Sequence, residues 1–254
     1  MSVSKNEGKA PPHLARTEML VGTEPLQRFR KMRIAIFGVG GVGGYVMEAL
    51  ARSGVGTLDL IDNDTVAESN LNRQIIATGE NLDKSKVNVA QARIKAIDPD
   101  IQVNTYETFY LPEMSGEIPF GEFNYIVDAI DTVSAKIDLV IQAQAHGVPI
   151  ISAMGCGNRL DPGKLVCTDI YKTQMDPLAK VLRKELRERG VKRLKVVYST
   201  EPPIKPMQAQ DDGNYTKKAD VKKQRKSVPG SSAFVPGAAG LMIASEVFRD
   251  ILDL

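Results

Sequence analysis

The sequence predicts an α/β protein in which one doubly wound, mostly parallel sheet, with additional antiparallel strands at its end, forms a single domain. Three observations favour this fold. Short apolar runs alternate with longer amphipathic segments along most of the chain, as is typical of parallel sheets covered by helices. The first such run is followed by a glycine-rich turn. The 254 residues, 43% of them hydrophobic, suit one large domain with a substantial core.

The glycine-rich turn has the features of a nucleotide site. It contains Gly38, Gly40, Gly41 and Gly43. A buried strand is predicted at 33–37, a helix at 42–53 and a second strand at 57–61, which ends on Asp62. This pattern matches the GxGxxG spacing of Rossmann-like folds, in which an acid about 20 residues further on binds a ribose. Glycines and free N–H groups at a helix N-terminus let a phosphate approach closely, but they leave open whether the ligand is a dinucleotide or ATP.

The rest of the chain continues the alternation of strands and helices. Ahead of the first strand, residues 16–29 are predicted to form one or two short helices. Further strands are predicted at 101–106, 125–129, 149–153, 165–170 and 195–199, and further helices at 84–97, 134–146 and 176–190. The apolar C-terminal part, 231–252, predicts a short strand followed by a helix that packs on the sheet.

Composition excludes several classes of protein. The net charge of +2 argues against a strongly basic or acidic molecule, and the absence of an apolar run of about 18 residues argues against a membrane partner. The two cysteines, Cys156 and Cys167, are too few and too far apart for a zinc ribbon or a disulfide framework. We therefore expect a cytoplasmic protein. Residues 1–12 are expected to be a mobile N-terminus, and 13–254 the folded domain, with a mobile basic loop at 207–228.

Several polar residues allow two interpretations at this stage. Lys86, in the first turn of its helix, is either a solvated surface residue or the partner of a bound anion. Asp131, where a strand meets its helix, is either an N-cap or a ligand group at the carboxyl edge of the sheet. The basic face of the helix at 176–190 is either solvated or a nucleic-acid contact. Cys156 and Cys167 are either buried small side chains or covalent nucleophiles.

Five motifs, in order along the chain, resemble the ubiquitin-activating-type (E1-like) adenylating superfamily. They are GVGGVGG at 38–44, LIDND at 60–64, NLNRQ at 70–74, Lys86 in its helix, and DAIDT at 128–132. The resemblance covers about residues 14–254. It implies ATP as the nucleotide, bound by Gly38, Gly40, Gly41, Gly43, Asp62, Asp64, Asn70, Asn72, Arg73, Gln74, Lys86, Ile130 and Asp131.

The resemblance also implies roles for these residues. Asp62 would hold the ribose of ATP, Arg73 and Lys86 would offset the charge of the triphosphate, and Asp131 would hold Mg²⁺. Arg16, in RTEMLVG, matches an arginine that commonly completes the site from a second subunit, which implies a homodimer. Fixed cations and a metal suit adenylation because charge moves along a polyphosphate.

Within this superfamily, the chain is most similar to the tRNA threonylcarbamoyladenosine dehydratases. Segments that carry the similarity include RTEMLVG, LNRQIIA, VDAIDTVSAK, DPLAKVLRKELR and VYSTEPP. The similarity implies activation of a carboxylate on modified adenosine 37 of tRNA and ring closure, with loss of water and release of AMP and pyrophosphate. It further implies a monovalent cation, Na⁺ or K⁺, and a cysteine desulfurase or sulfur-acceptor system as candidate partners.

Three alternatives compete with this hypothesis. A nicotinamide-dependent dehydrogenase would use the same glycine turn and Asp62, but it leaves Arg73, Lys86 and Asp131 unexplained. Adenylation of the C-terminal carboxylate of a ubiquitin-like or sulfur-carrier protein would use the same site, although activators of that kind generally have paired CxxC motifs, which this sequence lacks. The third alternative is a catalytically inert RNA-binding or scaffold protein.

Overall fold

The computed structural model describes residues 11–207 and 229–254. The predicted mobile N-terminus, 1–12, and the predicted basic loop, 207–228, therefore lie outside the described residues, apart from Pro11, Pro12 and Met207. The described chain starts with a short 3-10 helix, Pro12–Leu14, that leads into the predicted helical region. None of the described helices is long and apolar enough to cross a membrane.

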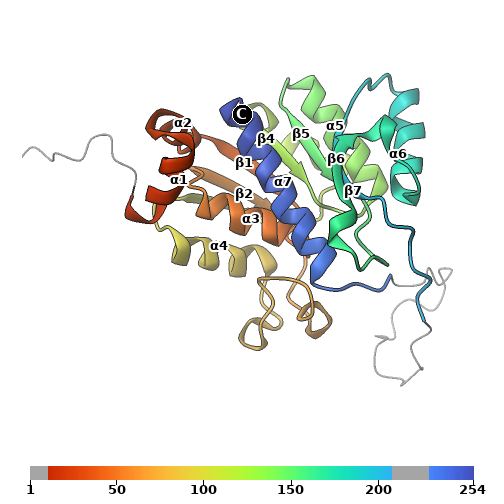
Figure 1. Ribbon diagram of the computed structural model, residues 1–254, viewed down its shortest axis with the longest axis horizontal. Helices are drawn as coiled ribbons and strands as arrows, with labels where there is room; N and C mark the ends of the chain where they lie inside the picture. The colour runs from red at the N-terminus through yellow and green to blue at the C-terminus, as the bar shows by residue number, and fades with distance from the viewer. Residues whose placement is uncertain (1–10, 208–228) are drawn as a thin grey trace, which may run out of the picture.

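A seven-stranded sheet in the order β3-β2-β1-β4-β5-β7-β6 forms the centre of the molecule (Figure 1). Its strands are β1 (Arg33–Phe37), β2 (Thr57–Ile61), β3 (Gln102–Tyr106), β4 (Tyr125–Asp128), β5 (Ile150–Ala153), β6 (Leu165–Asp169) and β7 (Lys195–Ser199). All neighbours pair in parallel except β6, which is antiparallel to β7. The predicted doubly wound, mostly parallel sheet with an antiparallel addition is confirmed.

Helices cover both faces of the sheet, and the alternation of side chains along β1 shows how. Ile34 and Ile36 belong to a core shared with α3 (Gly43–Arg52), α4 (Lys86–Ile97) and α7 (Phe234–Leu252). Ala35 and Phe37 belong to a second core with α5 (Val133–Ala145). A third core joins α5 to α6 (Pro177–Glu188). Two short helices, α1 (Ala15–Val21) and α2 (Thr23–Phe29), precede the sheet, as predicted.

The prediction of a short strand near the C-terminus is wrong. Its apolar residues form the first turn of α7, which begins at Phe234 and packs along α3 (Figure 1). A short apolar run has the same appearance in a strand and in a buried helix. Gly240 allows the close contact between the two helices, since an added β-carbon would lie 2.5 Å from the carbonyl oxygen of Val42.

Candidate active site

A cavity of about 330 Å³ lies at the carboxyl ends of β1, β2 and β4. The strand order reverses there, because the chain passes from β1 to β2 and β3 on one side and to β4 on the other. Ligands of open α/β sheets bind at such a switch point. Most of the predicted site residues line the cavity: Gly38, Gly40, Gly41, Asp62, Asp64, Asn70, Arg73, Gln74, Lys86, Ile130 and Asp131.

The glycine turn forms one wall of this cavity. Gly38 has a φ of +90°, and an added β-carbon would lie 2.8 Å from the carbonyl oxygen of Ala129. Gly43 does not line the cavity; a β-carbon there would lie 1.8 Å from the carbonyl oxygen of Gly38. Gly43 therefore closes the turn against α3, while Gly40 and Gly41 face the cavity. Gly38, Gly40 and Gly41 therefore combine a missing side chain with a place in the cavity wall.

Asp62, directly after β2, is held by the glycine turn and by the backbone that follows it. Its Oδ2 accepts a hydrogen bond from the amide of Val39 at 2.7 Å, and its Oδ1 accepts one from the amide of Asp64 at 2.9 Å. Each carboxylate oxygen can accept a further hydrogen bond. Asp62 is therefore oriented at the end of β2 and still able to accept hydrogen bonds from the hydroxyl groups of a ribose.

Lys86 is buried, so its interpretation as a solvated surface residue is wrong. Its Nζ donates a hydrogen bond to Oδ2 of Asp64 at 2.7 Å, and its side chain is 6% exposed against 61% for that of Asp64. The amide of Lys86 also donates to the carbonyl of Asp64 at 3.0 Å. A buried ammonium group needs a partner. The pair fixes this cation in the cavity wall, where a phosphate can replace or join the exposed carboxylate.

The NLNRQ motif forms a compact loop after β2. Oδ1 of Asn70 accepts from the amide of Ala67 at 3.1 Å, which fixes the loop. Nη1 of Arg73 donates to the carbonyl of Ser69 at 2.8 Å and to Oδ1 of Asn72 at 3.0 Å. Arg73 has no carboxylate partner within residues 11–207 and 229–254. These contacts orient its guanidinium group at the cavity and leave its charge available for an anion.

Two further residues of this motif have different positions. Asn72 does not line the cavity; its Nδ2 donates to the carbonyl of Ser231 at 3.0 Å and so ties the loop to the segment ahead of α7. Gln74 lines the cavity and is buried, and its Oε1 has no hydrogen-bond partner among the described residues. An unpaired buried amide oxygen next to a cavity is positioned to accept from a ligand.

Asp131 is not the N-cap of α5. The helix begins at Val133 with Thr132 as its N-cap. Asp131 is exposed and lines the cavity, and no hydrogen bond or ion pair engages its carboxylate in the described part of the chain. That part contains no cluster of three or more potential metal-ligating side chains. Mg²⁺ nevertheless fits Asp131, because this ion is commonly bound by one or two carboxylates together with the phosphates of a substrate.

Sequence reasoning missed two parts of the site. Thr108, Phe109 and Tyr110 line the cavity after β3, and Phe109 is 47% exposed. Beneath the cavity floor, the buried Nζ of Lys136 donates to both carboxylate oxygens of Asp128 at 2.9 Å and to the carbonyl of Ala153 at 2.8 Å. Thr108 lies just beyond the end of a predicted strand, and Asp128 and Lys136 fall within the VDAIDTVSAK segment, but neither signal indicated that they belong to the site.

Arg16 does not line the cavity. It lies exposed on α1. Leu14, just before α1, packs against Gly54 in the connection that leads into β2, so α1 lies at the amino edge of the sheet. The cavity lies at the carboxyl edge, so the chain does not bring its own Arg16 to its own Arg73, Lys86 and Asp131.

The surroundings of the two cysteines raise the pKa of both thiols. Burial, with a contribution from nearby Asp176, raises the pKa of Cys156 to about 12. Burial, with a contribution from Glu246, raises the pKa of Cys167 to about 11. Both groups are therefore protonated at neutral pH, whereas the thiolate is the nucleophile.

Replacing both Cys156 and Cys167 with alanine is therefore expected to leave turnover of ATP within about twofold of the original protein, since neither thiol is a nucleophile. Steady-state release of AMP, measured at a temperature where both proteins are folded, checks this expectation. A loss of more than tenfold in the double variant, reproduced by one single variant, would assign that cysteine a covalent role.

Comparison with known proteins agrees with the family resemblance of the sequence motifs. The model of the ThiF family matches residues 14–254. A tRNA threonylcarbamoyladenosine dehydratase of Bacillus subtilis is 39% identical over 241 residues, 94% of each chain. The Escherichia coli dehydratase is 34% identical over 237 residues, 90% of this chain and 87% of that one.

Solved structures agree as well. E. coli TcdA, a tRNA N6-threonylcarbamoyladenosine dehydratase, is similar in its complex with AMP, with a TM-score of 0.84, 30% identity, and coverage of 100% of this chain and 98% of that one. Its complex with ATP has a TM-score of 0.82 at 30% identity and covers 95% of this chain and 94% of that one. By its motifs, its fold and these similarities, the chain belongs to the ThiF family.

Proposed function

We propose that this protein is an ATP-dependent dehydratase that adenylates the carboxylate of threonylcarbamoyladenosine in tRNA and closes it to a ring. The observation that carries the proposal is the cavity in which the ribose acid Asp62, the cations Arg73 and Lys86 and the free carboxylate of Asp131 converge. Relatives named for this reaction match almost the whole chain, and a similar protein has been solved with AMP and with ATP.

The reaction has two steps. A carboxylate oxygen of the threonyl group attacks the α-phosphorus of ATP, and pyrophosphate leaves. The carbamoyl group then attacks the activated carbonyl carbon, a ring closes and AMP leaves, so the nucleoside loses one water. The second step is intramolecular, which removes the entropic cost of bringing two reactants together.

The chain's own residues supply binding and electrostatic stabilisation. Gly40 and Gly41 expose the turn to the phosphates, Asp62 accepts from the ribose, and Arg73 and Lys86 stabilise the negative charge that develops on the departing pyrophosphate. Asp131 would hold Mg²⁺, which when bound would offset further phosphate charge. Dependence on Na⁺ or K⁺ and contact with a sulfur-transfer system remain predictions from the family resemblance.

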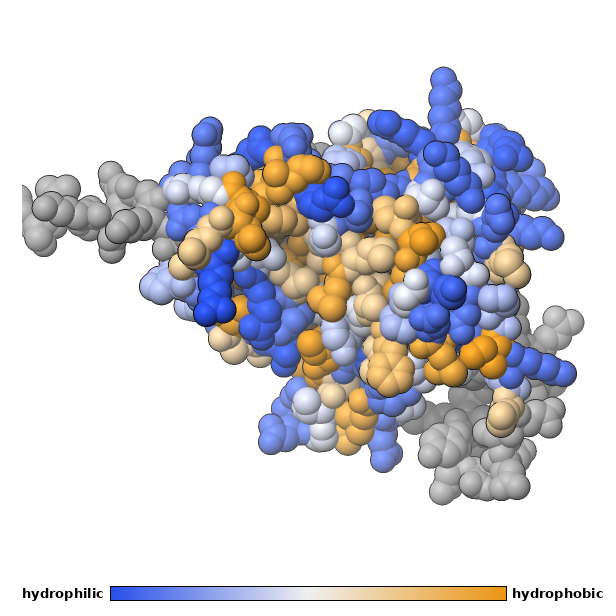
Figure 2. Space-filling model, in the orientation of Figure 1, coloured by the Kyte–Doolittle hydropathy of each residue, from blue (hydrophilic) through white to orange (hydrophobic). Residues whose placement is uncertain are grey.

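A homodimer would complete the site. Arg16 is exposed on α1, and next to it Met19 and Leu20 are 85% and 86% exposed, within the apolar area over α1 and α2 (Figure 2). Contiguous exposed apolar patches, unlike single apolar side chains, mark protein contacts. We propose that α1 packs against a second copy of this chain and that Arg16 enters the cavity of that copy.

Mixing two inactive variants tests this arrangement. Arg16→Ala and Arg73→Ala are each expected to abolish most turnover, but mixed dimers contain one intact site if Arg16 acts across the interface. Equal mixing with subunit exchange should then restore about a quarter of the original activity. Arg16 acting within its own chain predicts no recovery, and unmixed variants kept under the same conditions provide the control.

The function itself is tested by incubating the protein with ATP, Mg²⁺ and tRNA that carries threonylcarbamoyladenosine, followed by nucleoside mass analysis. The expected result is loss of one water from that nucleoside, with AMP and pyrophosphate formed. An unchanged nucleoside, together with AMP exchange on a small ubiquitin-fold protein, would contradict the proposal. That alternative is less favoured, because a relative named as an adenylyltransferase and sulfurtransferase, UBA4 of Vanderwaltozyma polyspora, matches only 54% of this chain.

A further inference from the structure

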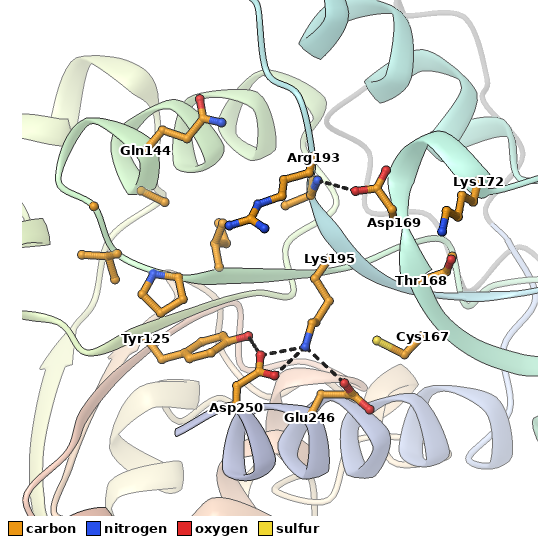
Figure 3. Close-up of a pocket in the computed structure, with 16 residues that line it drawn as sticks. Tyr125, Gln144, Cys167, Thr168, Asp169, Lys172, Arg193, Lys195, Glu246 and Asp250 are labelled. Atoms are coloured by element: carbon orange, nitrogen blue, oxygen red, sulfur yellow. Dashed lines mark hydrogen bonds and ion pairs between the residues drawn. The ribbon is translucent and has the colours of Figure 1, made fainter. Parts of the chain in front are cut away.

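A larger cavity, of about 860 Å³, lies at the opposite edge of the sheet from the nucleotide cavity (Figure 3). Its lining includes the first residues of β4 and β7, Tyr125 and Lys195, and the last residue of β6, Asp169. The proposed reaction does not use this cavity. Its polar groups fall into two sets, one held by ion pairs and hydrogen bonds and one without such partners among the described residues.

The inner part of this cavity is neutralised. Nζ of Lys195 lies 2.6 Å from Oδ1 of Asp250 and 3.3 Å from Oε2 of Glu246. The hydroxyl of Tyr125 donates to Oδ2 of Asp250 at 2.7 Å. The carboxylate of Asp169 accepts from backbone amides, at 2.8 Å and 3.2 Å. The ion pairs neutralise Lys195, and the carboxylate of Asp169 keeps its negative charge but has its hydrogen bonds satisfied by amides, so no cation among the described residues of this inner part is available to an anion.

Two cations of the cavity are available. Lys172 and Arg193 are both exposed, and neither has a hydrogen-bond or ion-pair partner in the part of the chain that the structure describes. Figure 3 shows Asp169 between them, with Arg193 extending toward the side of Gln144 and Lys172 on the other side, and both lie away from the ion pairs around Lys195. An anion that reaches this end of the cavity therefore meets two cations without ion-pair partners, next to one carboxylate, Asp169, that is held by backbone amides.

The basic residues of the neighbouring helix α6, and Lys192 after it, also include both paired and unpaired cations. Lys184 lies 3.9 Å from Glu188, and Arg189 lies 2.8 Å from Glu185, so these two cations are paired. Lys180, Arg187 and Lys192 are exposed and have no acidic partner among the described residues. The hydrophilic surface over α6 is visible at the right of Figure 2.

The unpaired cations lie on α6 and on the two segments beside it. We define the free-cation face as Lys172, Lys180, Arg187, Lys192 and Arg193. The guanidinium of Arg187 lies 5.3 Å from the ring centroid of Tyr171, the neighbour of Lys172, and the hydroxyl of Tyr171 donates to the carbonyl of Val191 next to Lys192. Lys180 lies seven residues before Arg187, and positions at that spacing share a helix face.

This face connects the two edges of the sheet. The N-cap of α6, Asp176, lies 3.7 Å from Arg159, which follows β5 on the edge of the nucleotide cavity. The chain after α6 reaches Arg193 just before β7 begins, on the opposite edge. The helix has 12 residues and is therefore about 18 Å long. The face thus extends from the side where the substrate reacts to the far cavity.

We infer that the free-cation face binds the phosphate backbone of the substrate tRNA, with Lys172 and Arg193 at its far end. The inference rests on the proposed function, which puts the modified base at the nucleotide cavity. The backbone on either side of that base carries regularly spaced charges, and exposed cations without acidic partners bind them by releasing counterions. Contacts of this kind position the nucleic acid and do not read its sequence.

The test compares two double variants with the same change in net charge. Lys172→Ala with Arg193→Ala removes two unpaired cations, and Lys184→Ala with Arg189→Ala removes two paired ones. We expect the first variant to weaken binding of tRNA carrying threonylcarbamoyladenosine about tenfold and to reduce the slope of log K against log salt by about two. The second variant should bind like the original protein.

Turnover separates this inference from the proposed function. With saturating tRNA, the first variant should reach the kcat of the original protein and the same KM for ATP, since neither Lys172 nor Arg193 lines the nucleotide cavity. Original affinity in the first variant, or equal weakening in both variants, would overturn the free-cation face. Failure of the original protein to dehydrate the nucleoside contradicts the proposed function instead, and it is observed without any variant.

Discussion

Replacing Arg73 with alanine is expected to lower turnover about 10²–10³-fold without unfolding the chain, by analogy with the loss of one preorganised donor at a developing negative charge. The guanidinium lines the nucleotide cavity and is oriented by Ser69 and Asn72, and no carboxylate in the described ranges offsets it. Removing the guanidinium takes away a positive charge that stabilises the negative charge developing on the departing pyrophosphate. AMP release at saturating ATP and tRNA measures the effect, and circular dichroism checks the fold.

Two further variants make this result interpretable. Arg73→Lys keeps the charge but loses the paired hydrogen-bond geometry of the guanidinium. Its turnover should therefore lie between that of the original protein and that of Arg73→Ala. Arg28→Ala removes an exposed arginine paired with Asp253, away from the cavity, and should leave turnover unchanged. Retention of full activity by Arg73→Ala would exclude this arginine from the mechanism and with it the assignment of the site.

The second large effect concerns stability. Lys136→Ala is expected to lower the free energy of unfolding by about 3–5 kcal/mol, because it leaves the carboxylate of Asp128 buried and unpaired. Both side chains are almost fully buried, at 1% and 0% exposure, so water cannot replace the missing ammonium group. For a chain of this size the melting temperature should fall by roughly 6–20 °C, which thermal unfolding measures.

A double variant distinguishes loss of the pair from loss of packing. Lys136→Met keeps much of the side-chain volume, and combining it with Asp128→Asn removes the buried charge as well. The double variant should be more stable than Lys136→Met alone, since replacing both partners of a buried pair costs less than removing one. If the two substitutions simply add, the pair does not explain the stability of the cavity floor.

Local patterns were sufficient for much of the fold. The predicted bounds of β1, β2 and β7 agree with the structure, because runs of apolar residues flanked by glycine or polar residues are properties of neighbouring positions. The same is true of the start of α6, where the side chain of Asp176 accepts from the amide of Ala179 at 2.8 Å. The glycine turn with Asp62 likewise indicated the nucleotide cavity from sequence spacing, and the NLNRQ motif did so through the family resemblance.

Other features depend on partners far away in the chain, and only the tertiary structure decided them. Burial of Lys86 depends on Asp64, 22 residues earlier, and a lysine in a first helical turn has no local signal for it. The first turn of α7 belongs to a helix that packs on α3, and its apolar run alone does not reveal that partner. The availability of Lys172 and Arg193 depends on which carboxylates fold beside them. Sequence determines which side chains are charged or apolar, but their burial and pairing are set by segments that only the folded sheet brings together.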